Sequence, residues 1–387
     1  MATHELRTLT VETPSRAHLD ALLAEGEGTK ISLFVPVVED PSFDEQSQTK
    51  VHLENLRREA GRRLAAARES EDWLSPLDGL RIEPNLFPPG TRGLALYLAG
   101  GNLRAFALHE PIQRAALRVQ STYALRPLVA ELQRNQRYRL IALAAGCVEL
   151  YEGDRYGLGE TQAPEVPSDL HDALGHEIRR TSNSLQWHAG SLGGDAAIFH
   201  GHGGPDRGRN VDRDRFHGLL AREIGRVWGA RHDPLVLAAD AAHQGRFRIR
   251  AEGELHGLLE DGVAGSPERQ SAREFAEAAW PLVAAWQTER QREREAQIPV
   301  ALAHGAATDD LERAVEFASS ARVARLWLAE DASREGRIDT TTGKLVEAEG
   351  EDLYDGLAAL VLEYGGEVWI TDRDLPGNAA FVAELRR

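Results

Sequence analysis

The residues best suited to chemistry gather in one short stretch, Phe199-His-Gly-His-Gly-Gly-Pro-Asp206. Its glycines free the backbone for positive φ angles, so successive amide groups can approach a phosphate or a carbonyl oxygen. A Walker loop is excluded because no Gly-Lys-Ser/Thr follows, and the glycine spacing differs from that of a Rossmann fingerprint. The competing interpretation is a strand-to-helix connection in which glycine serves only to reverse the chain.

Histidines are concentrated in the same region, since nine of the fourteen lie between His171 and His256. One hypothesis is a hydrolytic metal site, drawn from His200, His202 and His243 with Asp206, Asp212, Asp214 and Asp240. No complete ligand set stands at helical or strand spacing, however, so we expect solvated or capping histidines and no metal. A hydrolase that uses His200 or His202 as its general base is the alternative function that this motif supports.

The charge pattern separates this region from the rest of the chain, whose formal net charge is −16. From His200 to Arg250, ten arginines accompany six acidic residues, a local balance of +4. Arg246, Arg248 and Arg250 alternate as they would on one face of a strand. An arginine-bearing loop and strand of this kind can bind RNA phosphates. The alternative is that the arginines pair with the interleaved aspartates on a solvated surface.

Hydrophobic periodicity places this stretch between secondary-structure elements. A strand is expected over 196–199, a helix over 216–228 and a further buried strand over 234–240, which together suggest a parallel α/β unit. We expect three consecutive α/β domains, at 1–156, 170–268 and 271–387. The last should form a small three-layer α/β/α sandwich, because helices and strands alternate through it.

Length and composition bound the class of protein. The 387 residues are 42% hydrophobic and 27% charged, enough apolar material for several cores. No window approaches the roughly 18 consecutive apolar residues that a membrane span needs. The sequence therefore predicts a cytoplasmic protein without a membrane partner.

Several segments in order resemble a known family. These are Asp195-Ala-Ala-Ile-Phe-His-Gly-His-Gly-Gly-Pro205, then 214–228, then Pro234-Leu-Val-Leu-Ala-Ala-Asp240. Further matches are Ile31-Ser-Leu-Phe-Val-Pro36, 258–267, Gly365-Gly-Glu-Val-Trp-Ile370 and 380–386. Together they resemble the bacterial archaeo-eukaryotic release-factor-like proteins, which are relatives of the class I release factor and of the ribosome-rescue factor Pelota.

The resemblance implies a role on the ribosome and marks one departure. In the release factor a Gly-Gly-Gln loop supports peptide hydrolysis, and Gly203 and Gly204 align with its glycines, whereas Pro205 replaces the Gln. Proline has no N–H to stabilise an oxyanion, so we expect a factor that occupies the ribosome without cleaving peptidyl-tRNA. The RNA-binding residues would be Gly201, His202, Gly203, Gly204, Pro205, Arg207, Arg209, Arg213 and Arg215.

The resemblance also implies the partners. They would be the ribosome and its RNA near the A site during rescue or hibernation, with a translational GTPase such as elongation factor Tu, and no cofactor. A third interpretation is an interaction protein in which residues 271–387 alone form the docking module.

Overall fold

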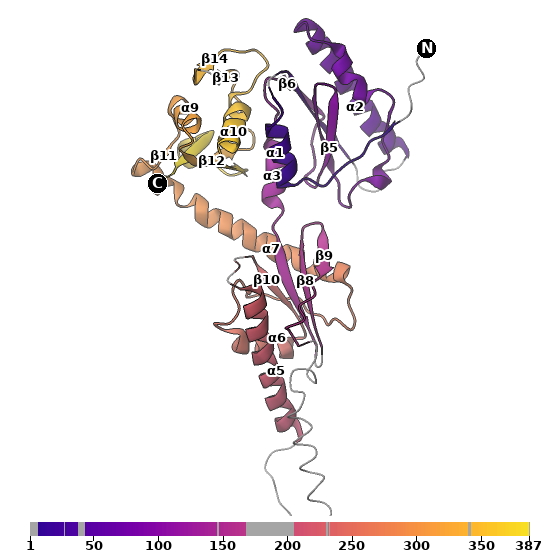
Figure 1. Ribbon diagram of the computed structural model, residues 1–387, viewed down its shortest axis with the longest axis vertical. Coiled ribbons are helices and arrows are strands. Elements are labelled where there is room, and N and C mark those ends of the chain that lie inside the picture. The colour runs from indigo at the N-terminus through magenta and orange to yellow at the C-terminus, as the bar shows by residue number, and fades with distance from the viewer. Residues whose placement is uncertain are drawn as a thin grey trace, which may run out of the picture. The chain divides into compact units, whose positions relative to one another are not determined.

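The computed structural model describes residues 7–26, 28–37, 43–144, 147–167, 205–229, 231, 233–339 and 342–386. The chain divides into two compact units: unit 1 combines residues 1–134 with 293–387, and unit 2 is formed by residues 135–292. Figure 1 colours the chain from its N-terminus to its C-terminus. None of the helices in the described ranges is long and apolar enough to cross a membrane.

The first sheet of unit 1 is antiparallel and is covered by helices on both faces. Its strands, in spatial order, are β5 (Asn102–Leu108), β4 (Gly93–Ala99), β2 (Lys30–Pro36) and β6 (Ala116–Gln120). Side chains alternate along β4, so Leu94 and Leu96 pack on one face while Ala95 and Tyr97 pack on the other. The first face is covered by α2 (Phe43–Ala66) and η1 (Glu71–Leu77), and the second by α1 (Arg16–Leu23) and α3 (Arg126–Arg134).

Short elements complete this half of unit 1. Strands β1 (Arg7–Thr8) and β3 (Leu80–Arg81) pair in parallel, and η2 (Pro84–Leu86) follows them. Ser15 caps α1, because its side chain accepts a hydrogen bond from the backbone N–H of His18. These contacts fix the entry to α1 and lay it against the first sheet.

The second sheet of unit 1 mixes parallel and antiparallel pairs. Its strands are β11 (Ala307–Thr308), β16 (Phe381–Leu385), β12 (Val323–Ala329) and β15 (Glu367–Thr371). One face carries α9 (Leu311–Ser319) and α10 (Leu353–Glu363), and the other carries α8 (Ile298–Ala303). Leu326 and Leu328 of β12 face the first layer and Trp327 faces the second, so the expected three-layer sandwich is confirmed. The hairpin β13 (Arg337–Asp339) to β14 (Lys344–Val346) and η3 (Pro376–Asn378) lie at its edges.

One hydrophobic core joins the two halves of unit 1. Leu19 and Leu128, from α1 and α3, belong to the same buried cluster as Leu353 and Leu357 from α10. At the edge of the second sheet, the side-chain amide of Gln133 donates to the carbonyl of Ile370 and its oxygen accepts from the N–H of Ile370, at 3.0 and 2.8 Å. Two segments far apart in the chain therefore fold as one body.

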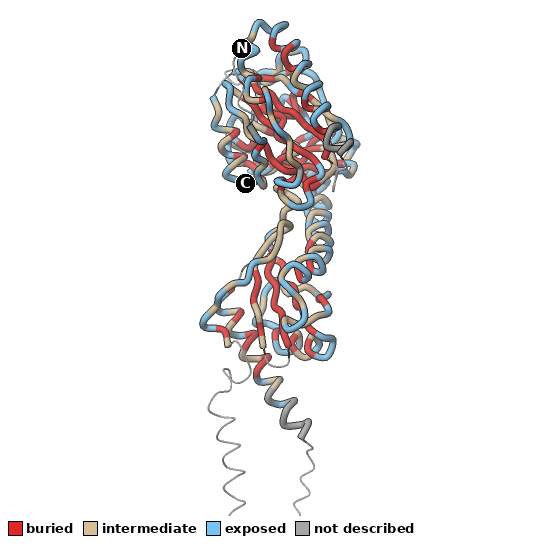
Figure 2. Tube along the Cα trace, turned by 90° about the vertical axis from the view of Figure 1, so that its right-hand side faces the viewer, coloured by how far each residue is buried: buried red, intermediate tan, exposed pale blue. Residues whose placement is uncertain are grey.

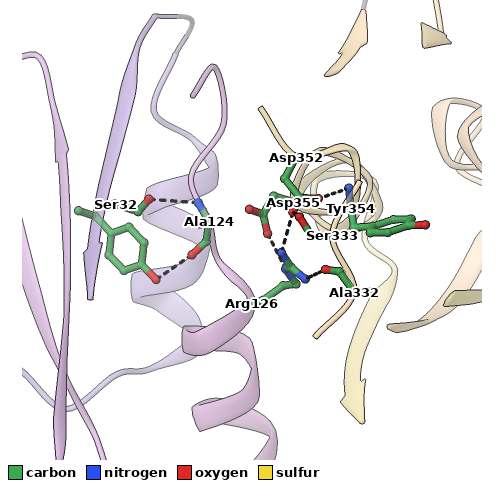
Figure 3. Close-up of polar contacts among 9 residues, drawn as sticks. Ser32, Ala124, Arg126, Ala332, Ser333, Asp352, Tyr354 and Asp355 are labelled. Atoms are coloured by element: carbon green, nitrogen blue, oxygen red, sulfur yellow. Dashed lines mark hydrogen bonds and ion pairs between the residues drawn. The ribbon is translucent and has the colours of Figure 1, made fainter. Parts of the chain in front are cut away.

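A buried ion cluster crosses the same contact (Figure 3). Arg126 Nε donates to Asp355 Oδ1 at 2.6 Å, and its Nη2 donates to Asp352 Oδ2 at 3.1 Å. The Arg126 side chain is 13% exposed and the two aspartates 5% or less, so all three charges are largely removed from water. Arg126 also donates to the carbonyl of Ala332, and Ser333 Oγ donates to Asp352. The aspartates thus depend on Arg126 for neutralisation.

Unit 2 is a three-layer sandwich around a sheet of four strands. The strands are β10 (Leu235–Ala238), β7 (Tyr138–Leu143), β8 (Val148–Asp154) and β9 (Gly157–Glu160). One face carries α5 (Pro205–Trp228) and α6 (Ala241–Ala251), and the other carries α7 (Ala272–Glu295). Figure 2 shows the buried residues concentrated in these strands.

The α/β fold class is confirmed, but the sheets do not follow the expected domain limits. We expected β7 and β8 inside a first domain ending at residue 156, whereas β7 pairs in parallel with β10 in unit 2. We also expected α7 to open the third domain, whereas its Phe275, Ala279 and Val283 pack under the sheet of unit 2. The pairing of β7 with β8 can be predicted because the two strands are joined by a short turn. The pairing of β7 with β10 leaves no local signal, since β10 follows some 90 residues later.

Candidate nucleic-acid interface

The glycine-rich stretch leads directly into α5. Gly201, His202, Gly203 and Gly204, together with His200, lie outside the described residues. Pro205 is the first residue of α5, a position that suits proline because its fixed φ matches the helix and its missing N–H has no helical partner there. The helix thus begins at Pro205, the residue that the resemblance aligns with the Gln of the release-factor motif.

Helix α5 is anchored by its C-terminal half. Phe216, Leu220 and Ile224 recur every four residues and are fully buried against β7 and β10. At 24 residues, α5 is roughly 36 Å long, and Figure 1 shows it continuing past the end of the sheet at its N-terminal side. The described contacts of α5 with this core therefore begin at Phe216.

Three arginines line the exposed face of α5. Arg215, Arg222 and Arg226 are exposed, and their separations of seven and four residues return each side chain to the same helix face. Arg226 also contacts Glu223 through its Nε at 3.0 Å while remaining 65% exposed. We call these three residues the α5 arginine stripe. Arg222 and Arg226 were not among the expected contact residues, although their helical spacing with Arg215 is visible in the sequence.

The four expected phosphate-binding arginines do not share one face. Arg215 belongs to the stripe, whereas Arg213 lies on the side of the helix that carries His217 and is partly buried. Arg207 and Arg209 stand in the first turns of α5, and their side chains lie outside the described ones.

The interpretation of Arg246, Arg248 and Arg250 as a strand face is wrong, because residues 241–251 form α6. Asp240 caps this helix, because its side chain accepts a hydrogen bond from the backbone N–H of His243 at 2.9 Å. This cap favours a helix over the strand that the alternating arginines predicted. Arg246 and Arg250 are one helical turn apart and both contact Asp214 of α5, at 3.5 and 3.2 Å. Arg248 donates to the carbonyl of Leu259, and burial is the main cause that lowers its pKa. These arginines hold α6 to its neighbours.

Two buried histidines meet where α5 packs on α6. His217 Nε2 and His243 Nδ1 lie 3.4 Å apart, and the two rings meet edge to face at 5.5 Å between centroids. Burial, followed by the charge of His243, lowers the pKa of His217 to about 4. His217 is therefore a neutral core residue at physiological pH.

The described residues contain no cluster of three metal-ligating side chains. Of the groups considered for a metal site, Asp214 binds two arginines and Asp240 caps α6, so both carboxylates have structural partners. His200 and His202 lie outside the described residues, as do the side chains of Asp206 and Asp212. The general-base hypothesis for His200 or His202 remains a prediction.

The sequence of this region matches a family. Residues 137–322 match the family described as bacterial archaeo-eukaryotic release factor family 3. The search of curated proteins returned no significant match.

Solved structures that this chain matches at low identity include Pelota proteins. Pelota from Archaeoglobus fulgidus is 13% identical with a TM-score of 0.32, over 76% of this chain and 79% of that chain. Archaeal Pelota in a ribosome-bound model with ABCE1 is 10% identical with a TM-score of 0.37, over 97% and 95%. Dom34 of S. cerevisiae, a termination-like factor that interacts with Hbs1, is 8% identical with a TM-score of 0.33, over 74% and 73%.

The matched residues run from the start of β7 to the end of α9 and thus include the sheet of unit 2, α5 with its arginine stripe, and α6. The chain is similar to release-factor-like proteins, as its sequence predicted, through residues 137–322, which match bacterial archaeo-eukaryotic release factor family 3.

Proposed function

We propose that this chain is a ribosome-associated translation factor of the release, rescue or hibernation type, which binds ribosomal RNA near the A site without cleaving peptidyl-tRNA. The observation that carries the proposal is the α5 arginine stripe, because it lies inside the family-matched region on the helix that follows the glycine-rich loop. Exposed guanidinium groups bind phosphates, and the positive end of a helix dipole at Pro205 favours them as well.

The negative net charge of the whole chain is compatible with RNA binding through one small basic surface. A net charge of −16 opposes non-specific coating of nucleic acid, whereas three arginines on one helix face can bind a defined set of phosphates. Arg246 and Arg250 of α6 both contact Asp214, which offsets one of their two positive charges, and we do not count them in the stripe.

The ribosome proposal is tested by sedimentation. We expect the protein from stressed cells to travel with ribosomes in a low-salt sucrose gradient and to be released by high salt. Replacement of Arg215, Arg222 and Arg226 by alanine should shift most of the protein to the soluble fractions. The matched control is Arg273→Ala with Arg292→Ala, which removes exposed arginines from α7 of the same unit. A wild-type protein found only in the top fractions at both salt concentrations would contradict the proposal.

Absence of hydrolysis is the second part of the proposal. Pro205 offers no backbone donor where the resemblance places the release-factor Gln, so purified protein should release no peptide from ribosomes loaded with peptidyl-tRNA. The same assay decides the alternative hydrolase function, which requires release by the wild type and its loss in His202→Ala.

A GTPase partner belongs to the same proposal. We propose that residues 271–387 contribute to docking a translational GTPase such as elongation factor Tu. Co-sedimentation of the full chain with purified elongation factor Tu in its GTP-bound form tests this, and equal binding of the GDP-bound form would argue against a translational role for the contact.

A further inference from the structure

Unit 1 contains a pocket whose volume is about 230 Å³ and which is separate from the α5 arginine stripe. It lies between the first sheet with α3 on one side and α10 with β15 on the other. Its apolar wall includes Phe34, Leu108, Ala116 and Ile370. The pocket is therefore built from both chain segments of unit 1, and a compact apolar group fits its walls.

Asp355 forms a polar part of the wall. It is 2% exposed, and its Oδ1 accepts the hydrogen bond from Arg126 Nε at 2.6 Å. Its Oδ2 has no hydrogen-bond partner among the described residues. In Figure 3 the carboxyl group of Asp355 projects from α10 toward the segment that carries Ala124, and Ala124 also lines the pocket. A buried carboxylate oxygen without a partner is costly, so this atom favours any donor that reaches it.

The arginines of the pocket are already turned toward protein acceptors. Arg126 contacts Asp355 and Asp352, Arg134 contacts Glu330 at 3.8 Å, and the exposed Arg118 donates to the carbonyl of Leu117. Glu131 also lines the pocket and binds the N–H and the ring of His109. The unsatisfied group in the wall is thus an acceptor, which selects a ligand with N–H donors over an anion.

We propose that this pocket binds a small molecule that carries an amidine or amine donor on a compact apolar body. The donor binds Asp355 Oδ2 after a small outward movement of the side chain, and the body lies against Phe34 and Ile370. Such a ligand neutralises the acceptor that Arg126 leaves without a partner, and it bridges the two segments of unit 1.

Benzamidine is the probe that tests this chemistry, and calorimetric titration of the full chain is the measurement. Benzoate has the same shape and the opposite charge, and benzamide is a neutral analogue. We expect benzamidine to bind, benzamide to bind at least tenfold more weakly, and benzoate not to bind. Asp355→Asn should weaken benzamidine binding at least tenfold, because the amide places a donor near the ligand's own donors.

A second variant separates binding from folding, since Asp355→Asn also weakens the contact with Arg126. Ala116→Leu fills the pocket from β6 and leaves the Arg126 cluster intact, so it should abolish binding while the unfolding temperature stays near that of the wild type. Glu312→Gln removes an exposed acid of α9 outside the pocket and should bind as the wild type does. Tighter binding of benzoate than benzamidine, no binding of benzamidine, or unchanged binding in Ala116→Leu would overturn the proposal.

Discussion

At the scale of single residues, the most consequential side chain of unit 2 is His217. It is fully buried, and only His243 among the described residues shares a hydrogen bond with its ring. The sequence raised a metal site or a general base as hypotheses for the histidines of this region, because many of them lie close together in the chain, but favoured solvated or capping histidines. The number of histidines in a segment does not determine how deeply each one is buried, however. The aromatic rings of Phe216 and Phe247 pack beside His217, which places it in the core.

The buried His217 predicts acid sensitivity of unit 2. Above its ordinary pKa of 6.5, the ring is neutral in both the folded and the unfolded chain, so the contribution to stability is complete. As the pH falls, the unfolded chain takes up a proton that the folded chain refuses until about pH 4. The free energy of unfolding should therefore drop by roughly 3 kcal/mol across this window.

Denaturant unfolding at several pH values between 7 and 4 measures this loss. His217→Gln should unfold with a flatter pH dependence, because it removes the group whose proton uptake differs between the two states. The exposed His256 serves as the control, and His256→Gln should follow the wild type. An identical pH slope in wild type and His217→Gln would show that other groups cause the acid sensitivity.

At the scale of elements, α5 has two different faces along one helix. Its C-terminal half supplies Phe216, Leu220 and Ile224 to the core, and its opposite face presents Arg215, Arg222 and Arg226. Asp214 fixes the helix to α6 through Arg246 and Arg250. These contacts hold the arginine stripe in one orientation within unit 2, and under the proposed function this lowers the entropy cost of binding a fixed set of phosphates.

The stripe predicts a measurable change in salt dependence. If each of its three arginines contacts one phosphate, replacing all three by alanine should reduce the slope of log K against log salt by about 2 to 3 for an RNA fragment of the A site. Fluorescence anisotropy over a range of salt concentrations gives this slope. The Arg273→Ala and Arg292→Ala control should keep the wild-type slope, and a slope unchanged in the stripe variant would exclude phosphate contacts by these residues.

Most helices and strands could be predicted from local sequence patterns. The predictions that failed concern contacts between residues far apart in the chain. The hairpins β4–β5 and β7–β8 were expected because their strands flank short turns, and both form. The parallel pairing of β7 with β10 could not be predicted from the sequence, since β10 lies far along the chain from β7. The alternation of Arg246, Arg248 and Arg250 led to the wrong prediction of a strand at α6, because three arginines at every second position occur in helices as well as in strands.

The site was predictable only in part for the same reason. The sequence identified the glycine-rich stretch and the local excess of arginine, but treated the arginines as one cluster. Packing then separates them: Arg246 and Arg250 pair with Asp214, while Arg222 and Arg226 join Arg215 on an exposed face. Which arginines are exposed depends on helix phase and on tertiary packing.

At the scale of the whole molecule, the main finding is that residues 1–134 and 293–387 share one core. This bears on the interpretation of residues 271–387 as an independent docking module. Without residues 1–134, Leu353 and Leu357 of α10 lose their neighbours on α1 and α3, and an apolar face is exposed. Docking experiments should therefore use the full chain.

The Arg126 cluster predicts strong coupling between these segments. Arg126→Met should lower the free energy of unfolding of unit 1 by about 3 to 5 kcal/mol, because it leaves Asp352 and Asp355 buried without their counter-ion. Chemical denaturation followed by tryptophan fluorescence measures the change. Arg16→Ala breaks an exposed pair with Asp20 and should cost less than about 1 kcal/mol. Equal effects of the two substitutions would refute a coupling role for Arg126.

The discontinuity of unit 1 also sets an order of events during synthesis. Residues 1–134 leave the ribosome first, and α1 and α3 can pack on the first sheet, but the part of their apolar surface that contacts α10 stays uncovered until α10 has been translated. The strands and helices of unit 2 all lie between these two segments, so unit 2 can complete its own core earlier. A nascent chain that stops before residue 353 would hold a folded arginine-bearing domain beside an unfinished one, and would present to chaperones and proteases the surface that the complete chain hides.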